Sequence, residues 1–522
     1  MVTYIIQDRS PSRDAKQYPP RKVVLPAMMA LWLAFFLVAL DRTIISTAIP
    51  TISNEFNSFG DIAWYESGFL LPLCVLQLSF GLVYKYYPTK PVLVSLVAIF
   101  EIGSIVCAIA PNSHSLIIGR VLTGIGGAGI GAGAFLLINL MVPLETRPVY
   151  LGAMGSVFGV TSAIGPVLGG YLTSVTWRWC FWINVPLGVI SIVLLIFLAP
   201  NTPAPAPRAR GWLGAIKQLD PLGFILIAPA LVCVLFALQW GGREYPWSDG
   251  RIIALFTIFG VFSIGFIVSQ AWRKEKATVP PRIILKRSIA AGCIAYIGAG
   301  SAMVNLSYYL PTWFQVIQGK STESSGLSLL PLLISIVVAV IGCGILTSVI
   351  GYYTPFMIAG SAFLIVGSAL ITTWQPDTKQ GMWIGYQIIA GFGLGLGLQQ
   401  PNVAAQTVLS DDDVPVALSL LNFINFLGGT ITVSLSQTLL QSKLINGLGQ
   451  VIPDLDASTL VNAGAGALRG KVSEDKLPLV IQVYNDSMRS IWYLILGLAC
   501  LSMVGSLLME WKSVKAKKAE AD

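Results

Sequence analysis

The chain has 522 residues, of which 55% are hydrophobic and only 11% are charged, and its mean hydropathy is +0.73. Soluble globular domains carry about 25% charged residues, so this composition argues against a cytosolic enzyme, a disordered protein and a nucleic-acid-binding protein. The net charge of +8 comes mostly from bases between apolar segments, as the positive-inside rule of membrane proteins requires. Because no repeated strand alternation is present, we expect an all-α polytopic membrane protein.

Apolar runs long enough to cross a bilayer, which takes about 20 residues, recur along the chain. There are fourteen of them, and a polar segment, residues 1–24, precedes the first. An even number of spans predicts that both termini lie on the same side of the membrane. The runs cover residues 25–50, 64–84, 91–110, 115–141, 149–174, 180–199, 219–240, 252–272, 289–317, 326–350, 353–374, 382–408, 414–440 and 489–510.

The distribution of Lys and Arg predicts which side that is. The two tails and the even-numbered connections hold 21 bases, whereas the odd-numbered connections hold ten. The positive-inside rule therefore makes both termini cytoplasmic. Residues 201–218 become a cytoplasmic loop and residues 441–488 the largest extracytoplasmic loop. Asn485 begins an N-glycosylation sequon in that loop.

Three charged residues stand out inside the predicted spans, where a charge costs about 2.5–3.5 kcal/mol. Neighbours on a helix point about 100° apart, so we expect Asp41 to face the bundle interior rather than to pair with Arg42, and to take part in proton transport or helix gating. Glu101 is interpreted as a proton carrier or a hydrogen-bonding strut. Arg120 keeps its proton, so we expect it to hold a carboxylate, the alternative being snorkelling toward the outer headgroups.

Uncharged amides gather in three later spans, with a tyrosine beside one of them. Those of the span 382–408 are spaced i, i+3, i+7 and share one helical face. We expect the set to line a cavity for a neutral organic molecule, the alternative being hydrogen bonds between helices. Its members are Asn305, Tyr308, Gln399, Asn402, Gln406, Asn422 and Asn425.

Motifs for nucleotide and metal chemistry are weak in this sequence. Residues 124–129 match G-x-G-x-x-G, but they lie inside a span with no strand before them, so close helix packing is the better interpretation. Residues 319–321 resemble the end of a P-loop, yet Phe314 replaces its first glycine. The single histidine, His114, and seven scattered cysteines predict no metal site. We expect no ATP, no cofactor and no enzymatic activity.

Residues 155–188 read GSVFGVTSAIGPVLGGYLTSVTWRWCFWINVPLG. The glycines give one helix a small-residue face that allows backbone contact with another helix. The proline removes a backbone hydrogen bond and bends that helix. A kinked, tightly packed span is suited to rocking as a unit. The residues concerned are Gly155, Gly159, Gly165, Pro166, Gly169 and Gly170.

As a pattern, this stretch resembles the antiporter motif of the major facilitator superfamily, and more narrowly its 14-span drug:proton antiporters. Residues 40–50 resemble the first-span motif of that group, and Arg120 with Gly124 resembles its fourth-span motif. Residues 399–401 and 510–512 look like the fungal toxin and multidrug efflux branch. The loop at residues 81–90 has the position of the gating loop, but only two lysines supply its charge.

The resemblance implies two six-helix bundles, residues 25–200 and 288–510, with two inserted helices and a cytoplasmic loop at 219–287 and a C-terminal tail at 511–522. It implies a monomeric antiporter in which inward protons drive export of small hydrophobic compounds, toxins or drugs. We expect Asp41, or else Glu101, to carry the proton and Arg120 to be the fixed counter-charge, although Glu101 belongs to no motif of that group. The proton gradient would be the only energy source. We expect the plasma membrane. The alternatives are a vacuolar or siderophore-type exchanger of the same fold and a membrane sensor that does not transport.

Overall fold

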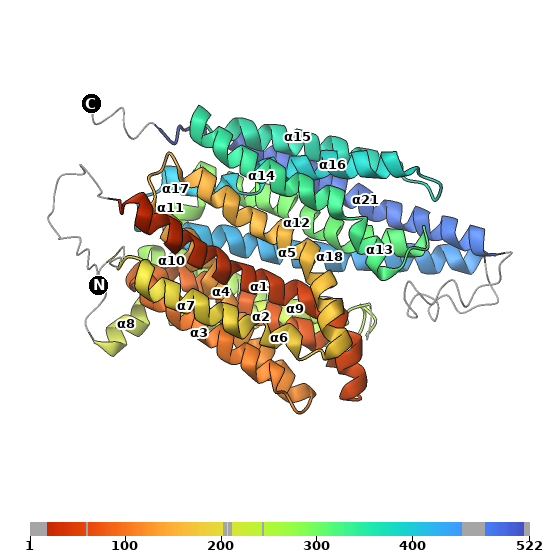
Figure 1. Ribbon diagram of the computed structural model, residues 1–522, viewed down its shortest axis with the longest axis horizontal. Helices are drawn as coiled ribbons and strands as arrows, with labels where there is room; N and C mark the ends of the chain where they lie inside the picture. Colours follow the sequence, from red (N-terminus) through yellow and green to blue (C-terminus); the bar gives the residue numbers. More distant parts are fainter. Residues whose placement is uncertain are drawn as a thin grey trace.

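The computed structural model describes residues 18–58, 61–201, 206, 211–242, 245–451 and 476–515. This part of the chain is helical, and its β-structure is limited to two isolated bridges. Fourteen of its helical segments are long and apolar enough to cross a membrane, which confirms the number of spans predicted from the sequence. They form two bundles that lie side by side with their helices roughly parallel (Figure 1).

The N-terminal bundle contains the first six spans. Its fifth helix packs against the first, and its third against the fourth. A short break at Ile183 divides the sixth span into two helices. The helices are α1 (Arg21–Glu55), α2 (Ile62–Tyr86), α3 (Thr89–Ala108), α4 (Ser113–Met141), α5 (Arg147–Val175), α6 (Trp179–Trp182) and α7 (Asn184–Leu198).

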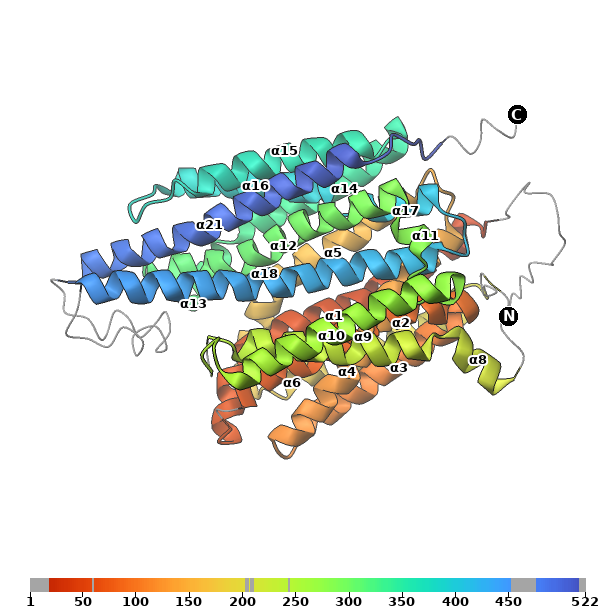
Figure 2. The same cartoon turned by 180° about the vertical axis from the view of Figure 1, so that it is seen from behind.

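The inserted region joins the two bundles. Helix α9 packs against α2 and α18 at the seam between them, and α10 packs along α9 (Figure 2). Only 11% of the residues in the most apolar stretch of α10 are buried, so this helix presents most of its surface to lipid. The elements are α8 (Trp212–Gln218), α9 (Pro221–Trp240), α10 (Gly250–Arg273), η2 (Lys274–Lys276) and α11 (Pro281–Ile284).

The C-terminal bundle contains the last six spans, one of which is broken between Gly397 and Gln400 before Pro401. Its helices are α12 (Arg287–Val316), α13 (Thr322–Leu327), α14 (Leu330–Ile350), α15 (Thr354–Ile371), α16 (Gln380–Gly397), α17 (Gln400–Val408), α18 (Val414–Val451) and α21 (Leu477–Leu508).

The predicted loop 441–488 is shorter than expected. Helix α18 continues to Val451 and α21 begins at Leu477, because both helices extend beyond the apolar stretch that defines a span. The centre of the loop, residues 452–475, lies outside the described residues, as do the predicted tail segments 1–17 and 516–522 and most of residues 202–210.

One end of the molecule, here called the termini face, carries the start of α1 and the end of α21 (Figures 1 and 2). Here the side chain of Tyr18 hydrogen-bonds Arg147, and the amide of Val514 donates to the carbonyl of Gly351 at 2.8 Å. Both contacts are made with short connections between spans. The first span begins and the last span ends at the same face, which agrees with an even number of spans. That this face is the cytoplasmic one is a prediction from the sequence.

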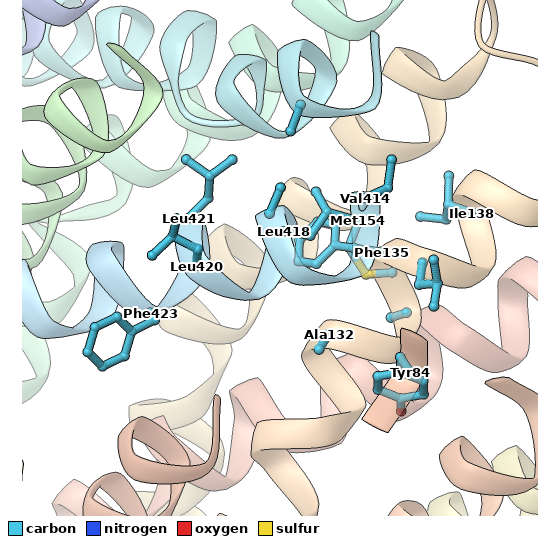
Figure 3. Packing of buried hydrophobic residues seen from close by; sticks show 14 of the residues in the cluster. Tyr84, Ala132, Phe135, Ile138, Met154, Val414, Leu418, Leu420, Leu421 and Phe423 are labelled. Carbon is cyan, nitrogen blue, oxygen red and sulfur yellow. The ribbon is translucent and has the colours of Figure 1, made fainter. Parts of the chain in front are cut away.

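The apolar core differs between the two ends of the molecule. Near the termini face one cluster runs through both bundles, and Figure 3 shows Phe135 and Met154 of the first bundle beside Val414 and Leu418 of the second. Toward the opposite face each bundle has a cluster of its own. The two bundles therefore share one hydrophobic core near the termini face, and each bundle has its own hydrophobic core toward the opposite face.

Glycines set the closest helix contacts within the first bundle. A Cβ on Gly103 of α3 would lie 2.6 Å from the backbone nitrogen of Thr123, and one on Gly126 of α4 would lie 2.7 Å from the carbonyl oxygen of Leu96. Real Cβ atoms do not approach so closely. Gly124 and Gly126 thus act in helix packing, as the sequence predicts, and their spacing holds α4 against α3 and α2.

Candidate functional site

A buried ion pair lies at the centre of the N-terminal bundle. Arg120, two turns into α4, pairs through Nη1 with the carboxylate of Asp41 on α1, and both side chains are fully buried. Asn112 caps α4 by accepting the amide of Ser115 at 2.9 Å, which fixes where the helix begins and hence the depth of Arg120. The structure thus brings together two of the three charged residues singled out in the sequence, although they are 79 positions apart.

Three further groups hold this pair. Arg120 Nε donates to the carbonyl of Tyr65 at 2.8 Å, and the guanidinium lies 4.7 Å from the ring centre of Phe69. Asn184 Nδ2 donates to Asp41 Oδ1 at 3.3 Å. Such additional hydrogen bonds stabilise a buried ion pair, and here they leave Arg120 Nη2 without a partner among the described residues. Asn184 belongs to the I-N-x-P-x-G segment of the antiporter motif, and that segment was the signal available in the sequence.

Glu101 on α3 lies close to this group without joining the ion pair. Asn184 Nδ2 also bonds Ser104 Oγ, one turn from Glu101, at 3.3 Å. A Cβ on Gly188 of α7 would collide with the Glu101 carboxyl, so the absence of a side chain at Gly188 leaves room for this carboxyl. Both carboxyl oxygens of Glu101 are buried, and neither has a hydrogen-bond partner among the described residues. A strut would have partners, so the geometry favours the proton-carrier interpretation over the strut.

The glycines of the antiporter motif serve two different contacts of α5. Gly155 and Gly159 face the other bundle. A Cβ on Gly155 would meet Gln399, in the break between α16 and α17, at 2.8 Å, and one on Gly159 would meet Val337 of α14 at 2.6 Å. Gly165 and Gly169 face α1 instead, against the segment that follows Asp41. Helix α5 therefore contacts the other bundle with its first half and α1 with its second half.

Two residues of that motif differ in role. A Cβ added to Gly170 would meet no heavy atom within 4 Å, and this glycine is exposed, so the prediction that it belongs to the packing face is wrong. Pro166 lies inside the continuous helix α5. Beside it, Thr43 of α1 donates its hydroxyl to the carbonyl of Thr161 at 3.1 Å. That bond ties α1 to α5 at the proline.

The amides of the twelfth span lie at the boundary between the bundles. Gln399 Oε1 accepts from Asn402 Nδ2 at 3.3 Å, and Gln399 packs over Gly155 of α5. Gln406 is buried, and both ends of its amide lack a partner among the described residues. Unpaired buried amides are uncommon and mark sites for water or a ligand. This supports the cavity interpretation for these three residues.

The other proposed cavity residues are placed differently. Asn305 is fully bonded within the bundle, donating to Thr432 Oγ1 at 2.9 Å and accepting from Ser436 at 2.6 Å, so it acts in helix packing. Asn422 donates to the carbonyl of Leu418 in its own helix, and Asn425 packs against Gly300. Tyr308 is 57% exposed.

Asn485 lies within α21 rather than in a loop. Its side chain is buried, accepts from Trp313 Nε1 at 2.9 Å and donates to the carbonyl of Trp374 at 3.1 Å. The amide nitrogen that would carry a glycan is thus occupied inside the bundle. This position argues against the predicted glycosylation. No group of three or more potential metal ligands occurs among the described residues.

An ionic cluster at the termini face joins three parts of the chain. Asp413, just before α18, accepts from Arg282 of α11 at 2.5 and 2.8 Å and lies 3.5 Å from Lys85 Nζ of α2. Burial disfavours the charged form of Asp413, but hydrogen bonds and charge from Arg282 and the charge of Lys85 outweigh it, so the pKa of Asp413 is lowered. We call these three residues the latch. Sequence reasoning missed the latch because its partners come from distant connections.

We predict that Asp413→Asn weakens closure at the termini face. Closure of the termini face loses about 1 kcal/mol of stabilisation, because Arg282 is 43% exposed and water screens its charge. The fraction of molecules that are open at this face is therefore expected to rise about fivefold. Distances between spin labels at Pro88 and Tyr352 measure this open fraction.

Because the pKa of Asp413 is lowered, the latch is complete at neutral pH and is lost as pH falls below about 4. Glu275→Gln is the control, because Glu275 bonds Arg282 but is 63% exposed; an equal effect would contradict the prediction.

Comparison with known proteins agrees with this architecture. The family model described as Major Facilitator Superfamily matches residues 31–433. The chain belongs to the major facilitator superfamily. Among its relatives, "MFS-type efflux pump MFS1" of Arthroderma benhamiae is 45% identical over 491 residues, covering 94% of this chain and 92% of the relative. "Aspyridones efflux protein" of Neocamarosporium betae is 42% identical, covering 98% and 92%.

Solved structures of this superfamily share the fold. The human organic anion transporter MFSD10 (TETRAN) matches with a TM-score of 0.58 at 12% identity, covering 92% of this chain and 100% of the other. The proton:xylose symporter XylE matches with a TM-score of 0.57 at 13% identity, covering 95% and 99%. At these identities the likeness establishes the fold alone. The superfamily member described here is therefore a multi-pass membrane transporter and not an enzyme.

Proposed function

We propose that this transporter is a proton-coupled efflux antiporter for small hydrophobic organic compounds. The observation that carries the proposal is the fully buried Asp41–Arg120 pair, with the unpartnered Glu101 carboxyl next to it. A carboxylate held by a fixed guanidinium loses that attraction when it binds a proton. Protonation therefore changes the relative stability of two conformations that hold the pair differently.

Relatives named as efflux pumps support the direction of transport, and a relative named for aspyridones supports a secondary metabolite or toxin as substrate. We infer that substrate binds between the bundles, near Gln399 and Asn402, and that the halves rock about the α5–α14 contact. Both termini would be cytoplasmic and the protein a monomer in the plasma membrane. A fluorescent fusion distinguishes this membrane from that of the vacuole.

Inverted vesicles that contain the purified protein test the proposal. An imposed acidic lumen is expected to drive accumulation of at least one of two aromatic dyes of opposite charge, fluorescein and tetramethylrhodamine methyl ester, in the wild type. Asp41→Asn should abolish the response to the gradient while dye still equilibrates down its own gradient. Glu101→Gln identifies the proton carrier, because loss of coupling in this variant alone assigns the role to Glu101. Dye flux that ignores the gradient in the wild type would refute proton coupling, and no flux at all would favour the membrane sensor.

A further inference from the structure

Arg42 has a position that neither the ion pair nor the latch explains. It follows Asp41 on α1, but neighbours on a helix point about 100° apart, and its guanidinium faces a different direction. The guanidinium carbon lies 6.0 Å from the ring centre of Phe158 on α5 and 5.9 Å from that of Phe426 on α18. The two rings belong to different bundles. Arg42 therefore lies at the boundary between the bundles.

The guanidinium of Arg42 forms no ion pair with any of the described residues. The described ion pairs of α1 are Asp41 with Arg120 and Glu55 with Arg178. Glu66 on α2 attracts Arg42 electrostatically, but no ion pair joins the two among the described residues, and Glu66 is exposed. Since Arg120 already pairs with Asp41, Arg42 supplies a positive charge between the bundles that only the more distant Glu66 attracts.

A cation without an ion-pair partner is costly inside a membrane protein, so a functional role is the default expectation. Arg42 is half-buried and its guanidinium makes no hydrogen bond among the described residues, which leaves its planar donors free for a ligand. Guanidinium binds carboxylates and other oxyanions through paired hydrogen bonds, and it stacks on aromatic faces. Phe158 and Phe426 on either side add surfaces on which an aromatic ring can pack.

We propose that Arg42 contacts the substrate and that the exported compounds are aromatic organic anions, carboxylates or phenolates, rather than the neutral molecules that the sequence favours. This inference rests on the proposed function, whose substrate class it names.

Export of an anion in exchange for a proton has an energetic consequence. An anion leaving the cell and a proton entering it both move positive charge inward, so a membrane potential that is negative inside adds to the driving force for export.

Two xanthene dyes of similar size and opposite charge test the inference, namely anionic fluorescein and cationic tetramethylrhodamine methyl ester. Binding of each to the detergent-solubilised full chain is measured by fluorescence anisotropy at pH 8. Arg42→Gln removes the charge at similar length, and Arg42→Lys keeps it. The expected result is a loss of fluorescein affinity of about tenfold or more in Arg42→Gln, partial recovery in Arg42→Lys, and no loss for the cationic dye.

Equal losses for both dyes in Arg42→Gln, or no fluorescein binding to the wild type, would overturn the inference. Thermal unfolding of each variant separates a folding defect from a binding defect, because a misfolded variant loses both dyes and is not restored by lysine. The proposed function fails separately. If anion binding depends on Arg42 but a proton gradient drives no flux, proton coupling is wrong and the substrate class stands. If the proton gradient drives transport of only the cationic dye, proton coupling stands and the proposed anionic substrate class is wrong.

Discussion

Replacing Arg120 with glutamine is expected to destabilise the protein by about 3–5 kcal/mol, because the change leaves the Asp41 carboxylate buried without its counter-charge. Both side chains are fully buried, so water cannot compensate. The Asn184 hydrogen bond alone, at 3.3 Å, is too weak to replace an ion pair. We expect a lower apparent Tm in detergent and little folded protein in the membrane.

The double variant Asp41→Asn with Arg120→Gln tests the cause. Removing both charges replaces the ion pair with two amides that can bond each other, so most of the lost stability should return. Proton-driven transport should remain absent, since no carboxyl is left at position 41. Thermal unfolding and dye flux in the same preparation measure the two properties. A double variant as unstable as Arg120→Gln would show that the fold needs Arg120 for its bond to Tyr65 and not for the charge pair.

Asp220→Ala is expected to cost about 2–4 kcal/mol, because one buried carboxylate satisfies several groups at once. Asp220 precedes α9 with φ 49°, a left-handed conformation that Asp tolerates. It accepts from the amide and the hydroxyl of Thr278, each at 2.8 Å, and from Gln270 at 3.1 Å, and it pairs with Arg273 at 2.9 Å. Alanine leaves these donors without an acceptor.

Asp249→Ala provides the matched control, since Asp249 caps α10 on the other side of the inserted pair with one bond to the amide of Arg251. An ordinary helix cap is worth about 1 kcal/mol. Thermal unfolding of the two variants side by side should therefore show a clearly larger loss for Asp220→Ala. Because Thr278 lies shortly before Arg282, loosening this segment should also weaken the latch. Equal effects of both variants would contradict the role given to Asp220.

The number of spans and their approximate ranges followed from the sequence because hydrophobic length is a local property. Helix ends did not follow, and α18 and α21 show the reason: both continue past their apolar stretch, where no hydropathy signal marks the boundary. The buried position of Asn485 was hidden for the same reason. A sequon is a local pattern, whereas burial depends on Trp313 of α12 and on Trp374 in the connection between α15 and α16.

The sequence predicted those site residues that are charged and lie inside membrane spans, because charged residues are rare there. Asp41, Glu101 and Arg120 were found because each is costly inside a membrane, and the pairing of Asp41 with Arg120 followed once they shared a bundle. The latch and Asp220 were not found, because carboxylates in connections are common and only the fold shows which base approaches them. Asn305 was misplaced because a bonded amide and a cavity-lining amide look alike in sequence.

The divided glycine face of α5 constrains how this transporter can vary. Gly155 and Gly159 set the distance to the other bundle, whereas Gly165 and Gly169 set the distance to α1 beside Asp41. One continuous helix thus carries both contacts, so a rotation of α5 that changes one contact also changes the other. A side chain added at Gly159 that shifts α5 relative to the other bundle is therefore expected to shift it relative to α1 beside Asp41 as well, so the two contacts are not expected to vary independently in related sequences.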